Sequence, residues 1–257
     1  MYEEMLIAVL FVIFGFFEFF HPAEAGQGRA GRLRNIVYGA FVLTVGATSA
    51  AFLFSMLPFA IRQHSGFSLW QVLTYGAAYV VLSDFLYYWY HRAQHKYRAL
   101  WTIHELHHSD KELNMLSSYR TYWLDFPVQT LLINAPVIYL LGFDSRGLFV
   151  AITIMTFFLI FSHANIRLHL GGMSRVLVGP QLHRIHHSQL SQHRDKNLAQ
   201  VFPIFDIVFG TYYHPAPNEY PPTGTHTLAS DTRFTDSFIR PFETWSRLVK
   251  PPRAPRP

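Results

Sequence analysis

Three short segments of the chain carry histidines at spacings that suit metal binding. The first has an H-x3-H pattern, and the other two each have an H-x2-H-H pattern. On an α-helix, residues i, i+3 and i+4 cover only about 100° of the circumference, so each triplet presents its imidazoles on one side. Imidazole is a common metal ligand. The eight histidines are His91 and His95, then His104, His107 and His108, and finally His183, His186 and His187.

A single histidine in an apolar helix is more often a hydrogen-bonded core residue than a metal ligand. With 15 histidines among 257 residues, chance produces one H-x2-H-H pattern about 0.05 times per chain. Two such patterns with H-x3-H shortly before the first therefore predict a metal site. Eight imidazoles are enough for two ions rather than one.

These segments resemble the fatty acid hydroxylase and sterol desaturase superfamily of integral-membrane di-iron oxygenases. The resemblance implies a centre with two iron ions and adds His163 as a ninth ligand, with Asn165 beside it as a supporting or weak ligand. It also implies that Asp206 orients the last triplet. The matching pieces cover residues 84 to 212 and comprise Asp84 to His95, Trp101 to Ser109, Phe161 to Leu168, Pro180 to Ser188, and Asp206 to Tyr212.

The resemblance further implies a lipid or sterol-like substrate, in which a C–H bond is hydroxylated or desaturated with O2. No flavin, nicotinamide or haem-binding module is recognisable, so electrons are expected from a separate reductase or small electron carrier. One departure concerns the tract Asn197-Leu198-Ala199, where the family often has Asn, an aromatic residue and Gly. This departure affects the expected loop geometry and substrate but leaves the ligands unchanged.

The composition indicates a membrane protein. Half of the residues are hydrophobic and only 14% are charged, against roughly 25% in a typical soluble domain. The net charge of +5 does not require nucleic acid, because the basic residues flank apolar stretches instead of forming one face. The absence of cysteine excludes disulfides, iron–sulfur clusters, thiolate-ligated haem and Cys-type zinc sites.

We therefore predict an all-α, multi-pass membrane bundle of about four to five membrane helices with a histidine-rich metal-binding cap. Residues 1–257 are expected to form one membrane domain, ending in a Pro-rich tail over 215–257. Within this tail, Thr232 to Lys250 has an amphipathic pattern broken at Pro241. The apolar stretches are Met5 to Phe20, Ile36 to Ile61, Phe67 to Tyr90, Trp123 to Phe143 and Gly147 to Phe161. Prolines make the fourth stretch either a kinked span or a re-entrant hairpin, and the last two together are expected to form a hairpin that turns at Gly142 to Gly147.

The distribution of charge predicts the orientation. Only Arg62 and Arg146 fall in the loops assigned to the side away from the histidines, leaving nineteen of the 21 Lys and Arg residues on the histidine side. The positive-inside rule makes that side cytoplasmic. The histidine cap is thus expected on the cytoplasmic face of a bacterial inner membrane or of the endoplasmic reticulum.

Asp84 precedes His91 by seven residues and lies only about 20° from it around a helix. A carboxylate in an apolar span is costly and is usually functional. We predict that Asp84 accepts an N–H from a ligand histidine and fixes its tautomer; the alternative is a hydrogen bond between packed helices. The remaining histidines are expected to be surface residues or, for His169, not to be ligands: His21, His64, His169, His193, His214 and His226.

Two other functions must be weighed. His104-Glu105-Leu106-His107-His108 also satisfies H-E-x-x-H, the zinc-protease signature in which Glu is the general base. A membrane protease would leave the other two histidine segments without a role, and Arg184 stands where the last triplet would need its base. A metal-transporting membrane protein would want ligands near the bilayer midplane, whereas these are expected at one surface.

Overall fold

The structure is a computed structural model and describes residues 2–57, 62–226, 228 and 233–249. In these residues it contains helices and three isolated β-bridges but no strand. The helices are α1 (Tyr2–Phe20), α2 (Arg29–Phe41), η1 (Val42–Gly46), α3 (Ala47–Ser55), α4 (Leu69–Lys96), α5 (Arg98–His108), η2 (Met115–Tyr119), α6 (Asp125–Gln129), η3 (Thr130–Asn134), α7 (Ala135–Leu141), α8 (Ser145–His163), η4 (Gly171–Arg175), α9 (Pro180–His186), η5 (Ser191–His193), α10 (Ile204–Val208) and α11 (Phe234–Val249).

Among the described residues, three helices are long and apolar enough to cross a membrane: Arg29–Ser55, Leu69–Lys96 and Ser145–His163. The first is α2, η1 and α3 joined end to end. Ala8–Phe20 and Asp125–Leu141 are apolar but shorter. The all-α prediction is confirmed, and the five expected apolar stretches are helical over most of their described residues, but only three of the described helices reach spanning length.

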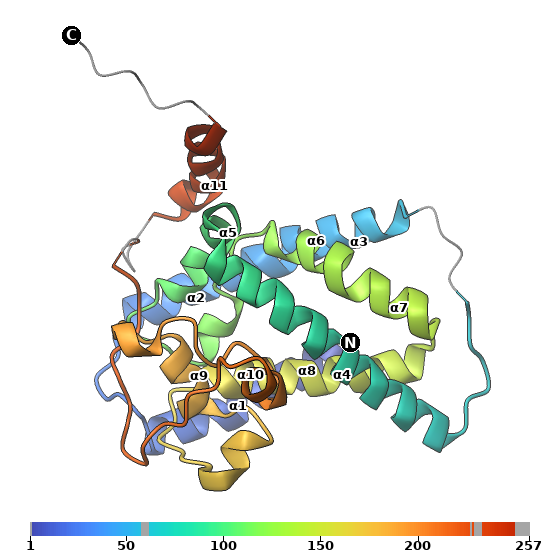
Figure 1. Ribbon diagram of the computed structural model, residues 1–257, viewed down its shortest axis with the longest axis horizontal. Coiled ribbons are helices and arrows are strands. Elements are labelled where there is room, and N and C mark those ends of the chain that lie inside the picture. The colour runs from blue at the N-terminus through green and yellow to red at the C-terminus, as the bar shows by residue number, and fades with distance from the viewer. Residues whose placement is uncertain (1, 58–61, 227, 229–232, 250–257) are drawn as a thin grey trace.

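The central helix is α4, which crosses the whole molecule diagonally in Figure 1. It begins at a capping box, in which the Ser68 side chain accepts from Gln71 N–H and the Gln71 side chain accepts in return. Its 28 residues correspond to about 42 Å, and it packs along α8 and against α5 and α7. Its last turns carry His91 and His95 out of the apolar region.

The predicted hairpin turn over 142–147 is confirmed between α7 and α8. Gly142 takes φ of 78° there, and Asp144 caps α8 by accepting from Gly147 N–H. The 62–68 loop lies beside this turn, since Gln63 bridges to Phe143 and Arg146 donates to the Phe67 carbonyl. Both loops assigned to the side away from the histidines thus lie together.

The N-terminal helix is fixed to the histidine-bearing end by a buried carboxylate. Glu18 is 3% exposed; it pairs with Arg32 at 3.1 Å and accepts the backbone N–H groups of Met115 and Asn165. These bonds join α1, α2, η2 and the segment after α8. A charge that interrupts an apolar helix in the sequence therefore holds four separate segments together.

The C-terminal helix α11 stands out from the rest of the molecule in Figure 1. The expectation that Pro241 breaks it is wrong, because α11 continues through Pro241. One side of α11 faces the body, where Trp245 Nε1 donates to the Ala99 carbonyl, while Ile239 and Phe242 are exposed. This packing against α5 compensates for the backbone bond that proline cannot make.

Candidate metal centre

The nine predicted histidines come from four helices that converge at one end of the bundle. The last turns of α4 and α5 supply five of them, and the C-terminal residue of α8 is His163. The short α9 starts with Pro180 at its first position, which suits a helix N-terminus. It provides His183 and His186, and His187 follows at its C-terminal cap.

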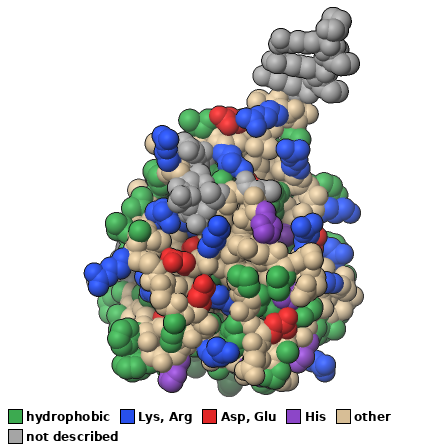
Figure 2. All heavy atoms as spheres, turned by 90° about the vertical axis from the view of Figure 1, so that its left-hand side faces the viewer, with side chains coloured by type: hydrophobic (Ala, Val, Ile, Leu, Met, Phe, Trp, Pro, Cys, Tyr) green, Lys and Arg blue, Asp and Glu red, His purple; other side chains and the backbone are tan. Residues whose placement is uncertain are grey.

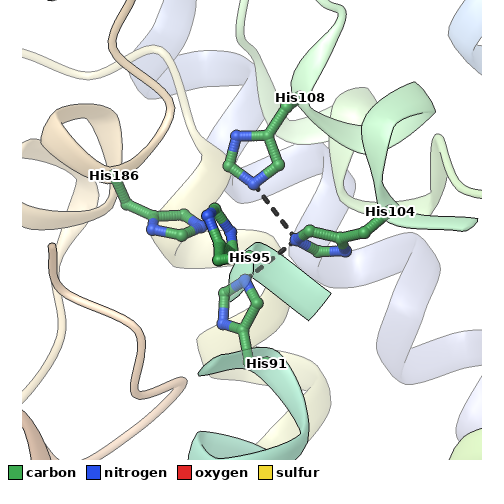
Figure 3. A group of neighbouring side chains, drawn as sticks. All are labelled: His91, His95, His104, His108 and His186. Atoms are coloured by element: carbon green, nitrogen blue, oxygen red, sulfur yellow. Dashed lines mark hydrogen bonds between the residues drawn. The ribbon is translucent and has the colours of Figure 1, made fainter. Parts of the chain in front are cut away.

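The nine imidazoles form two groups, and within each group the ligand atoms lie within 4.8 Å of one another. Figure 3 shows the rings of the first group turned toward a common point from α4, α5 and α9. The groups adjoin, since the His108 and His187 rings stack with centroids 4.3 Å apart. Group 1 comprises His91, His95, His104, His108 and His186, and group 2 comprises His107, His163, His183 and His187.

The two H-x2-H-H triplets are divided between the groups in opposite senses. In the first triplet His104 and His108 belong to group 1 and His107 to group 2. In the second triplet the i and i+4 residues belong to group 2, and the i+3 residue, His186, belongs to group 1. Each triplet therefore contributes to both groups instead of forming a separate three-ligand site.

The nitrogen spacings fit metal coordination. In group 2 the Nε2 atoms of His107, His163, His183 and His187 follow one another at 3.0, 3.1 and 3.1 Å. In group 1 the Nε2 atom of His104 lies 2.9 Å from that of His91 and 3.1 Å from that of His108. Ligands about 2.1 Å from an ion are about 3.0 Å apart at right angles and about 3.4 Å apart in a tetrahedron. The spacings are thus those of nitrogen ligands that share one ion.

The ionisation of the histidines also fits. Burial lowers the pKa of each histidine on α5 and α9 well below its ordinary range, and neighbouring imidazoles lower most of them further. Neutral imidazole is the form that binds metal. In addition, buried Nε2 atoms of His95 and His186 have no hydrogen-bond partner. The residues with lowered pKa are His104, His107, His108, His183, His186 and His187.

The segment 195–202 contacts the Nδ1 atoms of three of the five group 1 histidines. The Leu198 carbonyl accepts from His91 Nδ1 at 2.6 Å, and the Lys196 carbonyl accepts from His186 Nδ1 at 2.9 Å. The Asp195 carboxylate lies 3.3 Å from His95 Nδ1. With Nδ1 occupied in this way, each ring presents Nε2 to the group.

Sequence reasoning missed Asp195 and the carbonyls beside it. The signal that could have found Asp195 is its place among polar residues in His193-Arg194-Asp195-Lys196-Asn197. Asp195 and Asn197 have φ of 59° and 55°, a conformation that Asp and Asn tolerate better than other non-glycine residues. The carbonyls had no signal, because every residue type has one.

The hydrogen-bond partner predicted for Asp84 is wrong. Asp84 is fully buried but accepts from the backbone N–H groups of Gln200, Val201 and Phe202, at 2.7–3.2 Å, instead of from a histidine. It therefore anchors the end of segment 195–202. A non-helical turn packed against an apolar helix offers several N–H groups without backbone partners, and a buried carboxylate satisfies them at once.

The other two supporting residues also act differently from expectation. Asp206 accepts from the N–H groups of Leu198 and Ala199 and from the Thr211 hydroxyl, so it holds the segment behind His91 instead of the last triplet. Asn165 exchanges hydrogen bonds with the backbone of Glu24. Its contacts are to the N-terminal region and not to the imidazoles.

The histidines outside the two groups behave unequally. His193 was expected at the surface but is fully buried, with Nδ1 2.9 Å from Ser188 Oγ and Nε2 3.0 Å from Glu219 Oε1. His169 pairs with the Gln181 side chain, in keeping with the expectation that it is not a ligand. His21 and His226 are exposed.

Glu105 does not take the position of a protease base. Its Oε2 lies 3.0 Å from both Nε and Nη2 of Arg240 on α11, and it belongs to neither histidine group. An ion pair with α11 explains a glutamate inside the histidine triplet. The zinc-protease interpretation of His104 to His108 therefore has no support in the geometry.

A cavity of about 100 Å³ lies beside the two groups on the side of the apolar helices. Histidines of both groups line it, together with residues of α4, α6, α8 and η2. Its other walls include Tyr87, Tyr119, Asp125, Phe126 and Leu159. The cavity thus joins the histidine groups to the interior of the helix bundle.

Comparison with known proteins agrees with this arrangement. Residues 76–211 match the fatty acid hydroxylase family model. The chain is 28% identical over 215 residues to an ornithine lipid hydroxylase, OlsE, of Rhizobium tropici, covering 79% of this chain. It is 29% identical over 177 residues to the alkylglycerol monooxygenase of Homo sapiens, covering 66% of this chain.

The chain spans 64% of the length of the Rhizobium relative and 37% of the human one. No solved structure matches the chain. The matched family region includes every histidine of both groups as well as segment 195–202. From this match and the geometry of the site, the chain belongs to the fatty acid hydroxylase family.

Proposed function

We propose that this protein is a membrane-bound di-iron oxygenase that hydroxylates a C–H bond of a lipid. The observation that carries the proposal is the pair of adjoining imidazole groups, to which the long apolar helices α4 and α8 contribute from their C-terminal ends. Nine imidazoles without a carboxylate in either group suit iron. The names of the relatives support a lipid substrate. Desaturation of the same kind of bond is the alternative outcome.

The nine histidines would hold two iron ions, one in each group. Iron at such a site supplies the redox chemistry by which O2 is activated. The protein's own contribution is to fix the rings through hydrogen bonds from Nδ1. The Nδ1 atoms of His91 and His186 donate to carbonyls of segment 195–202. Those of His107 and His163 donate to the carbonyls of Arg120 and Leu159. Rings held in this way need no reorganisation when substrate binds.

The 100 Å³ cavity would receive the part of the lipid that reacts. Because α4 and α8 are long and apolar enough to span a membrane and also line the cavity, a lipid chain in the bilayer would reach the histidines without crossing the polar cap. The apolar side chains in its lining, Phe126, Leu159 and Leu198, would help to exclude water from the reacting bond. Hydroxylation consumes O2, two electrons and two protons, and yields the alcohol and one water, so electrons must come from a separate reductase or carrier.

Oxygen labelling tests the proposal. Reduced, iron-loaded protein incubated with lipid extract and labelled O2 is expected to give a lipid product that carries one labelled oxygen atom. A new double bond without label would indicate desaturation. The zinc-loaded protein is expected to be inactive, since zinc has no redox chemistry. Mass spectrometry of the lipids reports each result, and turnover by zinc protein without O2 would contradict an oxygenase.

We further propose that the histidine end faces the cytoplasm, as the excess of Lys and Arg there supports. The chain has no cysteine, so single cysteines report accessibility cleanly. Ser65 lies in the loop beside the α7–α8 turn and Ser191 begins η5 near the histidines, and both are exposed. Ser191→Cys is expected to label only from the cytoplasm and Ser65→Cys only from the opposite side. Labelling of both from one side would contradict this topology.

A further inference from the structure

A second cavity, of about 430 Å³, reaches group 1 through different histidines. His91 and His104 border the first cavity, whereas His95, His108 and His186 border the second. The two cavities share no lining residue. Group 1 can therefore be approached from two separate directions.

The mouth of the second cavity is basic. Lys96 at the end of α4, Arg98 at the start of α5 and Arg194 after η5 all line it and are exposed. The one carboxylate in the lining, Asp195, lies against His95. Lys and Arg side chains also extend over the molecular face seen in Figure 2, with fewer Asp and Glu. The three cations outnumber this one carboxylate, so the lining keeps a net positive charge that attracts an acidic partner.

The inner wall of this cavity touches the histidines directly. Trp101 lines it, and the Trp101 ring centroid lies 5.2 Å from that of His95 and 5.3 Å from that of His108. The cavity thus reaches group 1 itself, since His95, His108 and His186 also line it. Leu190 is the one aliphatic hydrophobic residue in the lining, so the cavity does not suit a lipid chain.

We propose that this basic mouth, formed by Lys96, Arg98 and Arg194, is the docking site for an acidic one-electron carrier protein. The proposal rests on the proposed oxygenase function, which needs external electrons. Each docking event would oxidise the carrier by one electron, and two events would supply the pair that hydroxylation consumes. The lipid would use the first cavity and the carrier the second, so neither blocks the other.

The probe is a plant-type [2Fe–2S] ferredoxin, which is an acidic one-electron carrier. Cytochrome c, a basic one-electron carrier, serves as the comparison. Full-length iron-loaded protein in nanodiscs of neutral lipid is expected to bind the ferredoxin, more weakly as salt is raised. Arg98→Glu with Arg194→Glu is expected to raise the dissociation constant at least about tenfold. The matched control is Arg29→Glu with Arg175→Glu, exposed positions outside the cavity, which should change it less than about twofold.

A second readout is the anaerobic oxidation of reduced ferredoxin by the iron-loaded protein in stopped flow. The cavity variant is expected to slow it about tenfold at low salt, while reduction by dithionite stays at the rate of the unsubstituted protein. No lipid turnover is needed, so the test stands even if the substrate proposal fails. Conversely, lipid turnover with dithionite but no ferredoxin binding would overturn the docking site alone.

Three further results would overturn the docking proposal. The first is equal weakening by the cavity variant and the control variant, which would indicate a general effect of charge. The second is tighter binding of cytochrome c than of ferredoxin. The third is loss of binding to anionic-lipid vesicles in the cavity variant with ferredoxin binding unchanged, which would assign the mouth to a lipid headgroup.

Discussion

Replacing His107 and His187 together by alanine is expected to lower the bound iron from close to two ions per chain to close to one. These residues come from different triplets, but both belong to group 2, which would keep only His163 and His183. Group 1 would keep all five of its imidazoles. Activity is expected to fall at least about 1,000-fold, because chemistry that uses two ions needs both. Metal analysis of the purified protein and product analysis measure the two effects.

The retained iron distinguishes triplets that are divided between the two groups from triplets that each bind their own ion. If each H-x2-H-H triplet bound its own ion, the double variant would damage both sites and retain little iron. Retention of one ion, with a single iron environment by Mössbauer spectroscopy, supports the division of the triplets between the groups. His21→Ala is the control, because His21 is exposed and lies outside both groups; it is expected to retain two ions and full activity.

Asp84→Ala is expected to lower both the stability of the protein and its affinity for iron. The substitution leaves the N–H groups of Gln200, Val201 and Phe202 without their acceptor. Unsatisfied buried N–H groups cost about 1–3 kcal/mol each, so the free energy of unfolding should fall by at least about 3 kcal/mol. Because segment 195–202 also holds His91, His95 and His186, iron affinity should fall about 10- to 100-fold.

Two further variants separate the effect on iron from the effect on folding. Asp84→Asn keeps an acceptor oxygen and is expected to lose less stability, about 1–2 kcal/mol. Asp144→Ala removes a different buried carboxylate, the cap of α8 at the opposite end of the molecule. It should cost about 1 kcal/mol with unchanged iron affinity. Unfolding of the iron-free protein and metal competition measure the two quantities, and equal loss of iron affinity in both alanine variants would contradict the role given to Asp84.

Much of the site was visible in the sequence because its signal is local. The nine histidines occur in four short tracts, and helical periodicity alone places the members of a tract on one side of a helix. The apolar stretches predicted the helices, because a membrane-spanning segment must be uniformly apolar over its length. Hairpin geometry followed in the same way from Gly142 and the stretches on either side of it.

Only the tertiary structure decided which segments far apart in the chain contact one another. Periodicity places His104, His107 and His108 on one helix face, but the second approaching helix determines which imidazole meets which, and so divides each triplet between two groups. Sequence cannot identify a backbone carbonyl as a partner, so the support of His91 by Leu198 was invisible.

The same limit applies to the charged residues. A buried carboxylate is recognisable as unusual from its apolar neighbours, but its partner depends on what folds against it. Asp84 met three backbone N–H groups 116 to 118 residues away, and Glu105 met Arg240 on α11, 135 residues away. The sequence therefore determined which residues bear the chemistry, and the packing of distant segments determined what each of them holds, because hydrogen-bond partners are chosen by proximity in space.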